Sequence, residues 1–300
     1  MTFLQGNDEA ILDLSSDRPQ IIGHRGSGLP AYKDGEALEE NGSPLLIGNT
    51  ASAIRKAIEA NVDWIEIDIR ASSDNELIVY HDETLNLKTN ASNKDEAIKV
   101  EDLNKQALQN IQLLVKPPEN ILTLEDVFSE FHSDQRKWIF DIKTTGIQEE
   151  ILSWIEHKVS SGELSDDQFI LFGSYNVLLE YKESGYNLGY TVTWGNEEGL
   201  TNRMHVLFTP SKIINRCETL GCHVLVLPTI FANQSLINTA RSEGFAVWVY
   251  GSDNILDHQY FSANGVSGLI VDDPQKAMDC FEGRSPKIEP FGAKRTLGGH

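Results

Sequence analysis

Cysteine, basic residues and long apolar runs are all scarce in this chain of 300 residues. The three cysteines (Cys217, Cys222 and Cys280) are an odd number in a chain of this size, so we expect free thiols in a reducing compartment and no disulfide framework. The 25 Lys and Arg residues face 45 Asp and Glu residues, and this net charge of −20 disfavours partners such as nucleic acid and anionic lipid surfaces. No apolar segment approaches the roughly 20 residues of a membrane span.

The N-terminus is also poor in the features of a targeting segment. Residues 1–17 are acidic and lack the basic and then apolar pattern of a signal peptide. We therefore expect a cytoplasmic protein.

The chain does contain a regular alternation of apolar extended segments and helical segments. The expected strands cover residues 20–26, 63–70, 137–143, 168–172, 187–193, 223–227, 246–250 and 268–271, and the expected helices cover residues 51–60, 123–131, 147–159, 176–183, 211–220, 233–243, 254–263 and 274–281. About eight such units predict an α/β fold of the (β/α)8 TIM barrel type, which typically needs about 250 residues. A doubly wound open sheet competes with it, but the Gly-rich turn that such a sheet usually has after its first strand is absent.

The barrel is expected to span residues 20–282. Residues 1–19 form an acidic N-terminal extension by composition, and residues 283–300 form a loosely held C-terminal tail. Residues 27–47 predict a surface excursion without periodicity. Residues 83–120 interrupt the alternation and predict a small insertion after the second strand region, helical around residues 100–114.

Residues 63–70 combine the pattern of a buried strand with charged side chains. Ile65, Ile67 and Ile69 occupy one face, so Glu66 and Asp68 share the other. Two carboxylates on one face of a core strand repel each other and lose hydration, so a cation, a basic partner or water must compensate them. A charged strand on a solvated sheet edge would be the simpler explanation of an isolated Glu-x-Asp pair.

Titratable side chains recur at the ends of the expected strands, which is where a TIM barrel places its active site. The residues concerned are His24 and Arg25 after the first strand, Glu66 and Asp68 late in the second, His81 after the extended run 76–82, Asp141 and Lys143 in the third, and Trp248 in the seventh. A single histidine at a strand end is usually an ordinary loop residue. Two histidines in register with three carboxylates favour a functional site.

Glu66, Asp68 and Asp141 form an all-oxygen set that suits one divalent cation, Mg²⁺ or Ca²⁺. His24 and His81 are candidates for a general acid and a general base.

Arg25 and Lys143 can pair with phosphate oxygens, although Lys143 could instead only neutralise Asp141. Trp248 is equally compatible with a substrate platform and with barrel filling. The whole set favours cleavage of a small-molecule phosphodiester.

These motifs, in this order, resemble the glycerophosphodiester phosphodiesterase family over roughly residues 20–280. The matching pieces are Gly23-His24-Arg25-Gly26, Asn49-Thr50, Ile65-Glu66-Ile67-Asp68, His81-Asp82 with Thr84-Leu85, Leu122-Thr123-Leu124-Glu125-Asp126-Val127, Asp141-Ile142-Lys143, Trp248 and the run from Gly265 to Pro274. The resemblance implies a (β/α)8 barrel, a divalent metal, and hydrolysis of glycerophosphodiesters to glycerol 3-phosphate and an alcohol. It also implies a cyclic phosphate intermediate formed by the neighbouring glycerol hydroxyl.

By the same resemblance, His24 and His81 would be the acid/base pair, and Arg25 and Lys143 would contact phosphate. Glu66, Asp68 and Asp141 would be the metal ligands.

The chain departs from the family pattern at three places. The family's Glu-Asn-Thr is Gly48-Asn49-Thr50 here, and its Glu-Ile-Lys is Asp141-Ile142-Lys143. The loop 27–47 is longer than in the compact bacterial pattern. Because of these differences, the sequence does not determine the head group of the substrate. It determines neither the metal nor the oligomeric state.

Two other functions compete with this one. The related sphingomyelinase D-like and lysophospholipase D-like barrels would act on a lipid with a tail, but the largely polar insertion argues against an apolar mouth. An inactive barrel that binds a phosphate ligand is the second alternative, and the presence of both histidines and all three carboxylates argues against it.

Overall fold

The computed structural model describes residues 17–28, 47–85, 89–91, 97–115, 117–132, 136–192 and 210–283, and the backbone of four short strands between residues 32 and 44. The predicted N-terminal extension and C-terminal tail lie almost entirely outside the described residues. Among the helices of the described part, none has the length and apolar character that crossing a membrane requires.

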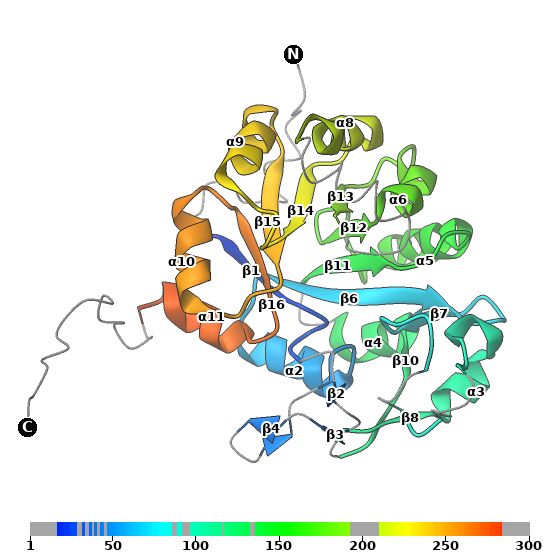
Figure 1. Cartoon of the computed structure of the whole chain (residues 1–300). Coiled ribbons are helices and arrows are strands. Elements are labelled where there is room, and N and C mark those ends of the chain that lie inside the picture. The colour runs from blue at the N-terminus through cyan, green and yellow to red at the C-terminus, as the bar shows by residue number, and fades with distance from the viewer. Residues whose placement is uncertain are drawn as a thin grey trace, which may run out of the picture.

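Eight parallel strands form a closed barrel in the described part of the chain (Figure 1). They are β1 (Gln20–Gly23), β6 (Trp64–Ala71), β11 (Lys137–Ile142), β12 (Phe169–Gly173), β13 (Leu188–Thr191), β14 (Val224–Pro228), β15 (Ala246–Tyr250) and β16 (Gly268–Val271). Each strand pairs with its neighbour along the chain, and β1 closes the ring because it pairs with both β6 and β16. The predicted (β/α)8 barrel is confirmed.

Helices surround the barrel and cover the outer faces of its strands (Figure 1). They are α2 (Ala51–Glu59), α4 (Leu124–Phe131), α5 (Gln148–Ser161), α6 (Tyr175–Tyr181), α8 (Pro210–Leu220), α9 (Gln234–Ser242), α10 (Ile255–Ala263) and α11 (Pro274–Phe281). Several begin at a residue whose side chain accepts a hydrogen bond from a backbone N–H of the first turn, as Thr50 and Asn233 do. These bounds agree with the predicted helices to within a few residues.

Each barrel strand is buried on both faces, which explains its nearly continuous apolar sequence. The outward side chains pack against the helices in one large cluster that includes Ile65, Phe140 and Leu225. The inward side chains, among them Ile22 and Ile139, form a second cluster that fills the barrel. Charged residues within the barrel strands occur only on β6 (Glu66, Asp68 and Arg70) and β11 (Lys137 and Asp141).

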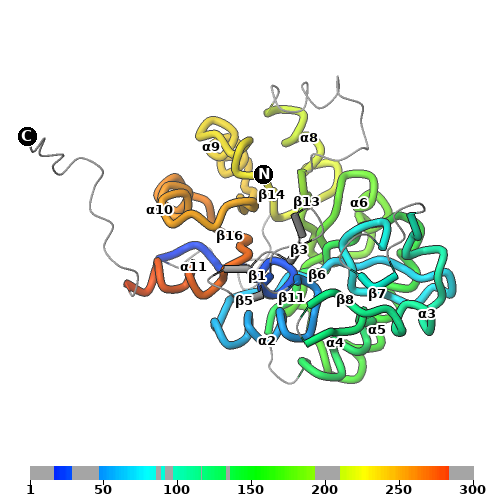
Figure 2. The backbone as a smooth tube through the Cα atoms, turned by 60° about the horizontal axis from the view of Figure 1, so that its bottom comes forward, coloured from blue at the N-terminus to red at the C-terminus, as the bar shows by residue number. Residues whose placement is uncertain are grey.

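The insertion between β6 and β11 packs on one side of the barrel beside α4 (Figure 2). It contains β7 (Leu77–Val79), a short 3-10 helix (Val100–Asp102), α3 (Lys105–Gln109), β8 (Gln112–Leu113), β9 (Glu119–Asn120) and β10 (Leu122–Thr123). Strand β7 pairs in an antiparallel manner with the C-terminal end of β6. The insertion has its own small core, which includes Ile47 and Tyr80 at the edge of the barrel.

The prediction of a helix over residues 100–114 is wrong in its extent. The side chain of Asn104 caps the start of α3, and the helix ends at Gln109, with Asn110 at its C-terminal cap. Gln112 and Leu113 then leave the helix and pair with Asn120 and Glu119.

Most of the predicted excursion at residues 27–47 lies outside the described residues. Its described backbone forms two short antiparallel pairs, of β2 (Tyr32–Lys33) with β3 (Glu36–Ala37) and of β4 (Glu39–Glu40) with β5 (Ser43–Pro44).

Candidate active site

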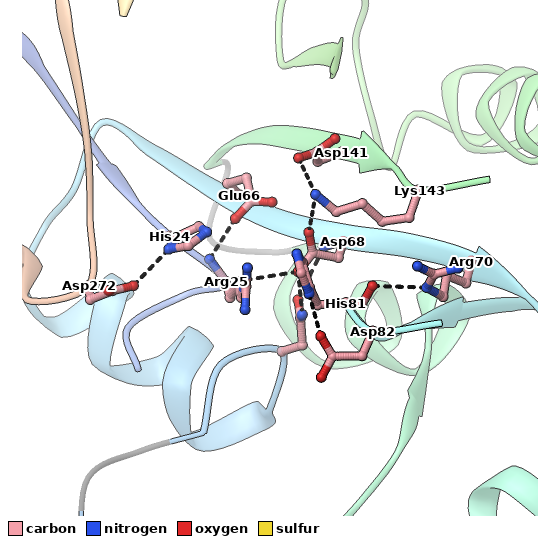
Figure 3. A network of polar contacts seen from close by, with 11 residues as sticks. His24, Arg25, Glu66, Asp68, Arg70, His81, Asp82, Asp141, Lys143 and Asp272 are labelled. Atoms are coloured by element: carbon pink, nitrogen blue, oxygen red, sulfur yellow. Dashed lines mark hydrogen bonds and ion pairs between the residues drawn. The ribbon is translucent and has the colours of Figure 1, made fainter. Parts of the chain in front are cut away.

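Three carboxylates meet at the C-terminal mouth of the barrel (Figure 3). Glu66 and Asp68 lie on the inward face of β6, and the register places Asp141 of β11 directly beside Asp68. One oxygen of each carboxylate lies within 4.8 Å of one oxygen of the other two. The exposed fractions of these residues are only 2%, 0% and 9%, so their charges are removed from bulk water.

Two cationic side chains compensate part of this negative charge. The Nζ of Lys143 lies 2.5 Å from Oδ2 of Asp141 and 2.8 Å from Oδ1 of Asp68, and the Nε of Arg25 lies 3.1 Å from Oδ2 of Asp68. Burial acts to raise the pKa of Asp68, but Lys143 and Arg25 hold that pKa well below its usual range. Burial likewise opposes the charge of Lys143, yet Asp141 and Asp68 raise the pKa of its ammonium group. Asp68 is therefore an anion at neutral pH.

Glu66 is less well compensated than Asp68. The backbone N–H of Arg25 donates to its Oε2 (2.7 Å), but Oε1 is buried and receives no hydrogen bond within the described residues. Burial raises the pKa of Glu66 well above its usual range, and the charges of Asp68 and Asp141 add to the effect. A buried oxygen without a donor, close to two other carboxylates, fits the oxygen shell of a hard divalent cation.

Asn49 also holds Asp68 in place, through two hydrogen bonds. Its Nδ2 donates to Oδ2 of Asp68 (2.7 Å), and its Oδ1 accepts from the backbone N–H of Asp68 (3.1 Å). Asn49 and Arg25 both adopt the left-handed backbone conformation (φ 63° and 54°), and the N–H of Asn49 donates to the carbonyl of Arg25 (2.8 Å). Such conformations are uncommon in residues other than glycine, so the surrounding contacts must hold both residues in place.

Each of the two histidines is held by an aspartate through Nδ1. His24 contacts Oδ1 of Asp272 and His81 contacts Oδ1 of Asp82, both at 2.7 Å. Because an ionised carboxylate only accepts, we assign the Nδ1 hydrogen to these bonds, which leaves Nε2 of each ring to exchange a proton. Burial is the main reason that the pKa of His81 is lowered from its usual value.

Trp248 is placed away from these groups, in the interior of the barrel. Its side chain is fully buried, and its ring packs against those of Trp64 and Phe172, with centroids 5.9 Å and 5.6 Å apart. The indole also covers Gly268, where a Cβ atom would lie only 2.6 Å from the ring. A substrate platform needs an exposed ring face, so we assign Trp248 to the barrel filling.

Sequence reasoning gave no role to several residues that the structure places at the mouth. Asp272 follows the eighth strand, so the strand-end criterion would have selected it. Tyr250, at the end of β15, donates a hydrogen bond to the carbonyl of Val192 (2.9 Å). Burial and the nearby charge of Asp141 raise the pKa of its phenol to about 12.

The profile described as "Glycerophosphoryl diester phosphodiesterase family" matches residues 24–276. The chain belongs to this family. The predicted family and enzyme class, a phosphoric diester hydrolase, are thereby confirmed. A glycerophosphodiester phosphodiesterase of Caldanaerobacter subterraneus subsp. tengcongensis is 24% identical over 239 residues, which are 76% of this chain and 89% of its own length. YhdW of Bacillus subtilis is 29% identical over 232 residues, which are 75% of this chain and 89% of its own length.

Solved structures of family members share the fold. An Oleispira antarctica phosphodiesterase in complex with the product sn-glycerol-3-phosphate has a TM-score of 0.66 and 19% identity, covering 90% of this chain and 99% of its own. A glycerophosphodiester phosphodiesterase of Thermotoga maritima has a TM-score of 0.59 and 21% identity, covering 86% of this chain and 96% of its own.

The glycine at position 48, where the family pattern has Glu, changes the surroundings of Arg25. A Cβ atom at Gly48 would lie 2.5 Å from Cβ and 3.0 Å from Cδ of Arg25. The side chain of Arg25 thus lies where a side chain at position 48 would begin. A small pocket opens at this point, and its lining comprises Arg25, Ile47, Gly48, Asn49, Tyr80, His81 and Asp82.

Proposed function

We propose that this family member is a metal-dependent phosphodiesterase that hydrolyses glycerophosphodiesters to glycerol 3-phosphate and an alcohol. The observation that carries the proposal is the placement of three buried carboxylates beside two aspartate-held histidines at one barrel mouth. Family membership supports the reaction class. The glycerol 3-phosphate bound to the Oleispira antarctica relative supports this product.

Glu66, Asp68 and Asp141 would hold one divalent cation, Mg²⁺ or Ca²⁺, since all three offer oxygen ligands. When bound, such a cation stabilises the negative charge that develops on the phosphoryl oxygens. The Nη atoms of Arg25 make no hydrogen bond within the described residues, so they can donate hydrogen bonds to phosphate oxygens. Lys143 keeps a positive charge between Asp68 and Asp141 and so limits the repulsion of the carboxylates.

The two histidines would move the protons. In the first step Nε2 of one ring removes the proton of the glycerol hydroxyl next to the phosphate, and that oxygen forms a bond to phosphorus. The bond from phosphorus to the alcohol breaks, and the other ring donates a proton to the departing oxygen. Water then opens the cyclic phosphate with the roles of the rings reversed, which yields glycerol 3-phosphate.

Phosphorus NMR of the purified protein tests this proposal. Glycerophosphocholine and lysophosphatidylcholine are each incubated with Mg²⁺, with Ca²⁺ or with EDTA. We expect glycerol 3-phosphate from the first substrate with a divalent cation and none with EDTA; a transient cyclic phosphate signal supports the internal nucleophile. Activity that survives EDTA would rule out the metal mechanism, and turnover of the lyso-lipid alone would favour the lipid-directed alternative.

A further inference from the structure

Arg70 is a second arginine close to the active site. The mechanism proposed above gives it no role. It lies on β6 two residues beyond Asp68, where that strand has left the barrel and pairs with β7. Its Nε donates a hydrogen bond to the backbone carbonyl of His81 (2.9 Å) (Figure 3). Within the described residues this is the only hydrogen bond of its side chain.

The two histidines differ in what fixes them to the barrel. The bond between His24 and Asp272 joins residues that follow β1 and β16, two neighbouring barrel strands, so it locks the ring to the barrel itself. The bond between His81 and Asp82 joins adjacent residues of one loop. It orients the imidazole relative to that loop and cannot place the loop relative to the carboxylates.

Two hydrogen bonds from β6 supply the missing connection. The N–H of Tyr80 donates to the carbonyl of Asp68 (3.1 Å), and the carbonyl of His81 accepts from Arg70. Residues 80–82 form no regular secondary structure, and the side chain of Tyr80 is buried in the small core of the insertion. The strand that carries Glu66 and Asp68 thus also holds the backbone of His81.

We propose that Arg70 is a positioning residue, which fixes the backbone of His81 so that its imidazole stays beside Asp68. This inference rests on the proposed function, in which His81 transfers a proton. Displacements of about 1 Å in a catalytic group can reduce turnover by about 10²-fold, so a single bond to the backbone of such a group is significant.

Two variants of nearly equal shape separate the hydrogen bond from the charge. Nε2 of a glutamine occupies the place of Nε of arginine along the side chain, so Arg70→Gln keeps the donor and removes the charge. Arg70→Met has a similar length and no donor. We expect Arg70→Met to lower kcat by about 10- to 100-fold with little change in KM, and Arg70→Gln to retain most of the activity. Equal losses in both variants would assign the role to the charge and overturn the proposal.

A matched control and a double mutant complete the kinetic test. Arg55 lies on α2 with its side chain 54% exposed, so Arg55→Met should leave kcat unchanged. If Arg70 acts through His81, Arg70→Met should cost nothing further in a His81→Ala background. A full additional loss there would contradict the positioning role.

NMR spectroscopy tests the proposal without an activity measurement. Long-range ¹H–¹⁵N correlation spectra of the labelled protein report the tautomer and surroundings of each imidazole, and the His81 signals are identified by their loss in His81→Ala. We expect them to shift or broaden in Arg70→Met, to stay near their wild-type positions in Arg70→Gln, and the His24 signals to be unchanged in both. Unchanged His81 signals in folded Arg70→Met would refute the proposal, whereas absent diester hydrolysis by the wild type would refute only the proposed function.

Discussion

At the scale of single residues, His24 and His81 carry the chemistry of the proposed mechanism, and Asp272 and Asp82 contact their Nδ1 atoms. Replacing either histidine by alanine should lower kcat by about 10²-fold or more, because each ring moves a proton in the proposed mechanism. Steady-state assays with glycerophosphocholine measure this, with circular dichroism to verify folding. Full activity in either variant would remove that histidine from the mechanism.

If Glu66 is a metal ligand as proposed, it should make metal binding depend on pH. Its pKa is raised by burial and by Asp68 and Asp141, so its carboxyl tends to hold a proton in the metal-free protein. A ligand must be deprotonated, so binding of Mg²⁺ should release a proton below that raised pKa, and the apparent affinity should increase as pH rises toward it. Above the raised pKa the affinity should become independent of pH.

Calorimetric titrations in two buffers with different ionisation enthalpies count the protons released by Mg²⁺. Glu66→Gln should abolish the release, and Asp68→Asn should weaken Mg²⁺ binding without abolishing the fold. Identical heats in both buffers for the wild type would show that Glu66 already ionises in the metal-free protein.

The candidate site was predictable where it follows from strand alternation and from the position of residues at strand ends. Glu66 and Asp68 share a face because successive side chains of a strand alternate, and the carboxyl ends of parallel strands converge on one rim. Asn49 contacts a residue that is 19 positions away in the chain, and Asp272 contacts one that is 248 positions away. No local sequence pattern encodes such partners. The sequence left Trp248 equally compatible with a substrate platform and with barrel filling, because the residue pattern does not give the depth of a side chain in the barrel.

At the scale of elements, α4 depends on its first turn. The side chain of Thr123 accepts from the N–H of Asp126, and the side chain of Asp126 accepts from the N–H of Thr123. Thr123→Ala removes one of these bonds and should lower the free energy of unfolding by about 1 kcal/mol, with kcat unchanged. Denaturation in urea measures the change; an unaltered midpoint would mean that packing alone holds the start of α4.

The barrel strands were predictable because burial on both faces leaves largely apolar runs, which charged residues interrupt only in β6 and β11. The insertion was not, since its elements are only two to five residues long and depend on partners outside their own segment. Strand β8, for instance, forms where Gln112 and Leu113 pair with Asn120 and Glu119. Short polar segments therefore carry little information about their own conformation.

At the scale of the whole molecule, metal binding should add to the stability of the barrel. A cation that binds the folded chain and not the unfolded one contributes about 2.7 kcal/mol when its concentration is 100 times Kd. We expect Mg²⁺ or Ca²⁺ to raise Tm by several degrees in a concentration-dependent way, and EDTA to reverse the rise. Asp68→Asn should show a much smaller shift at the same concentrations, and an equal shift in both proteins would place the bound cation elsewhere.

In the proposed mechanism, the bond between His24 and Asp272 also affects when the chain can first become active during its synthesis. Asp272 is synthesised 248 residues after His24. Until β16 reaches β1, a nascent or truncated product carries a histidine without the carboxylate that orients it. If His24 transfers a proton as proposed, full activity therefore requires that β16 has been synthesised and has paired with β1.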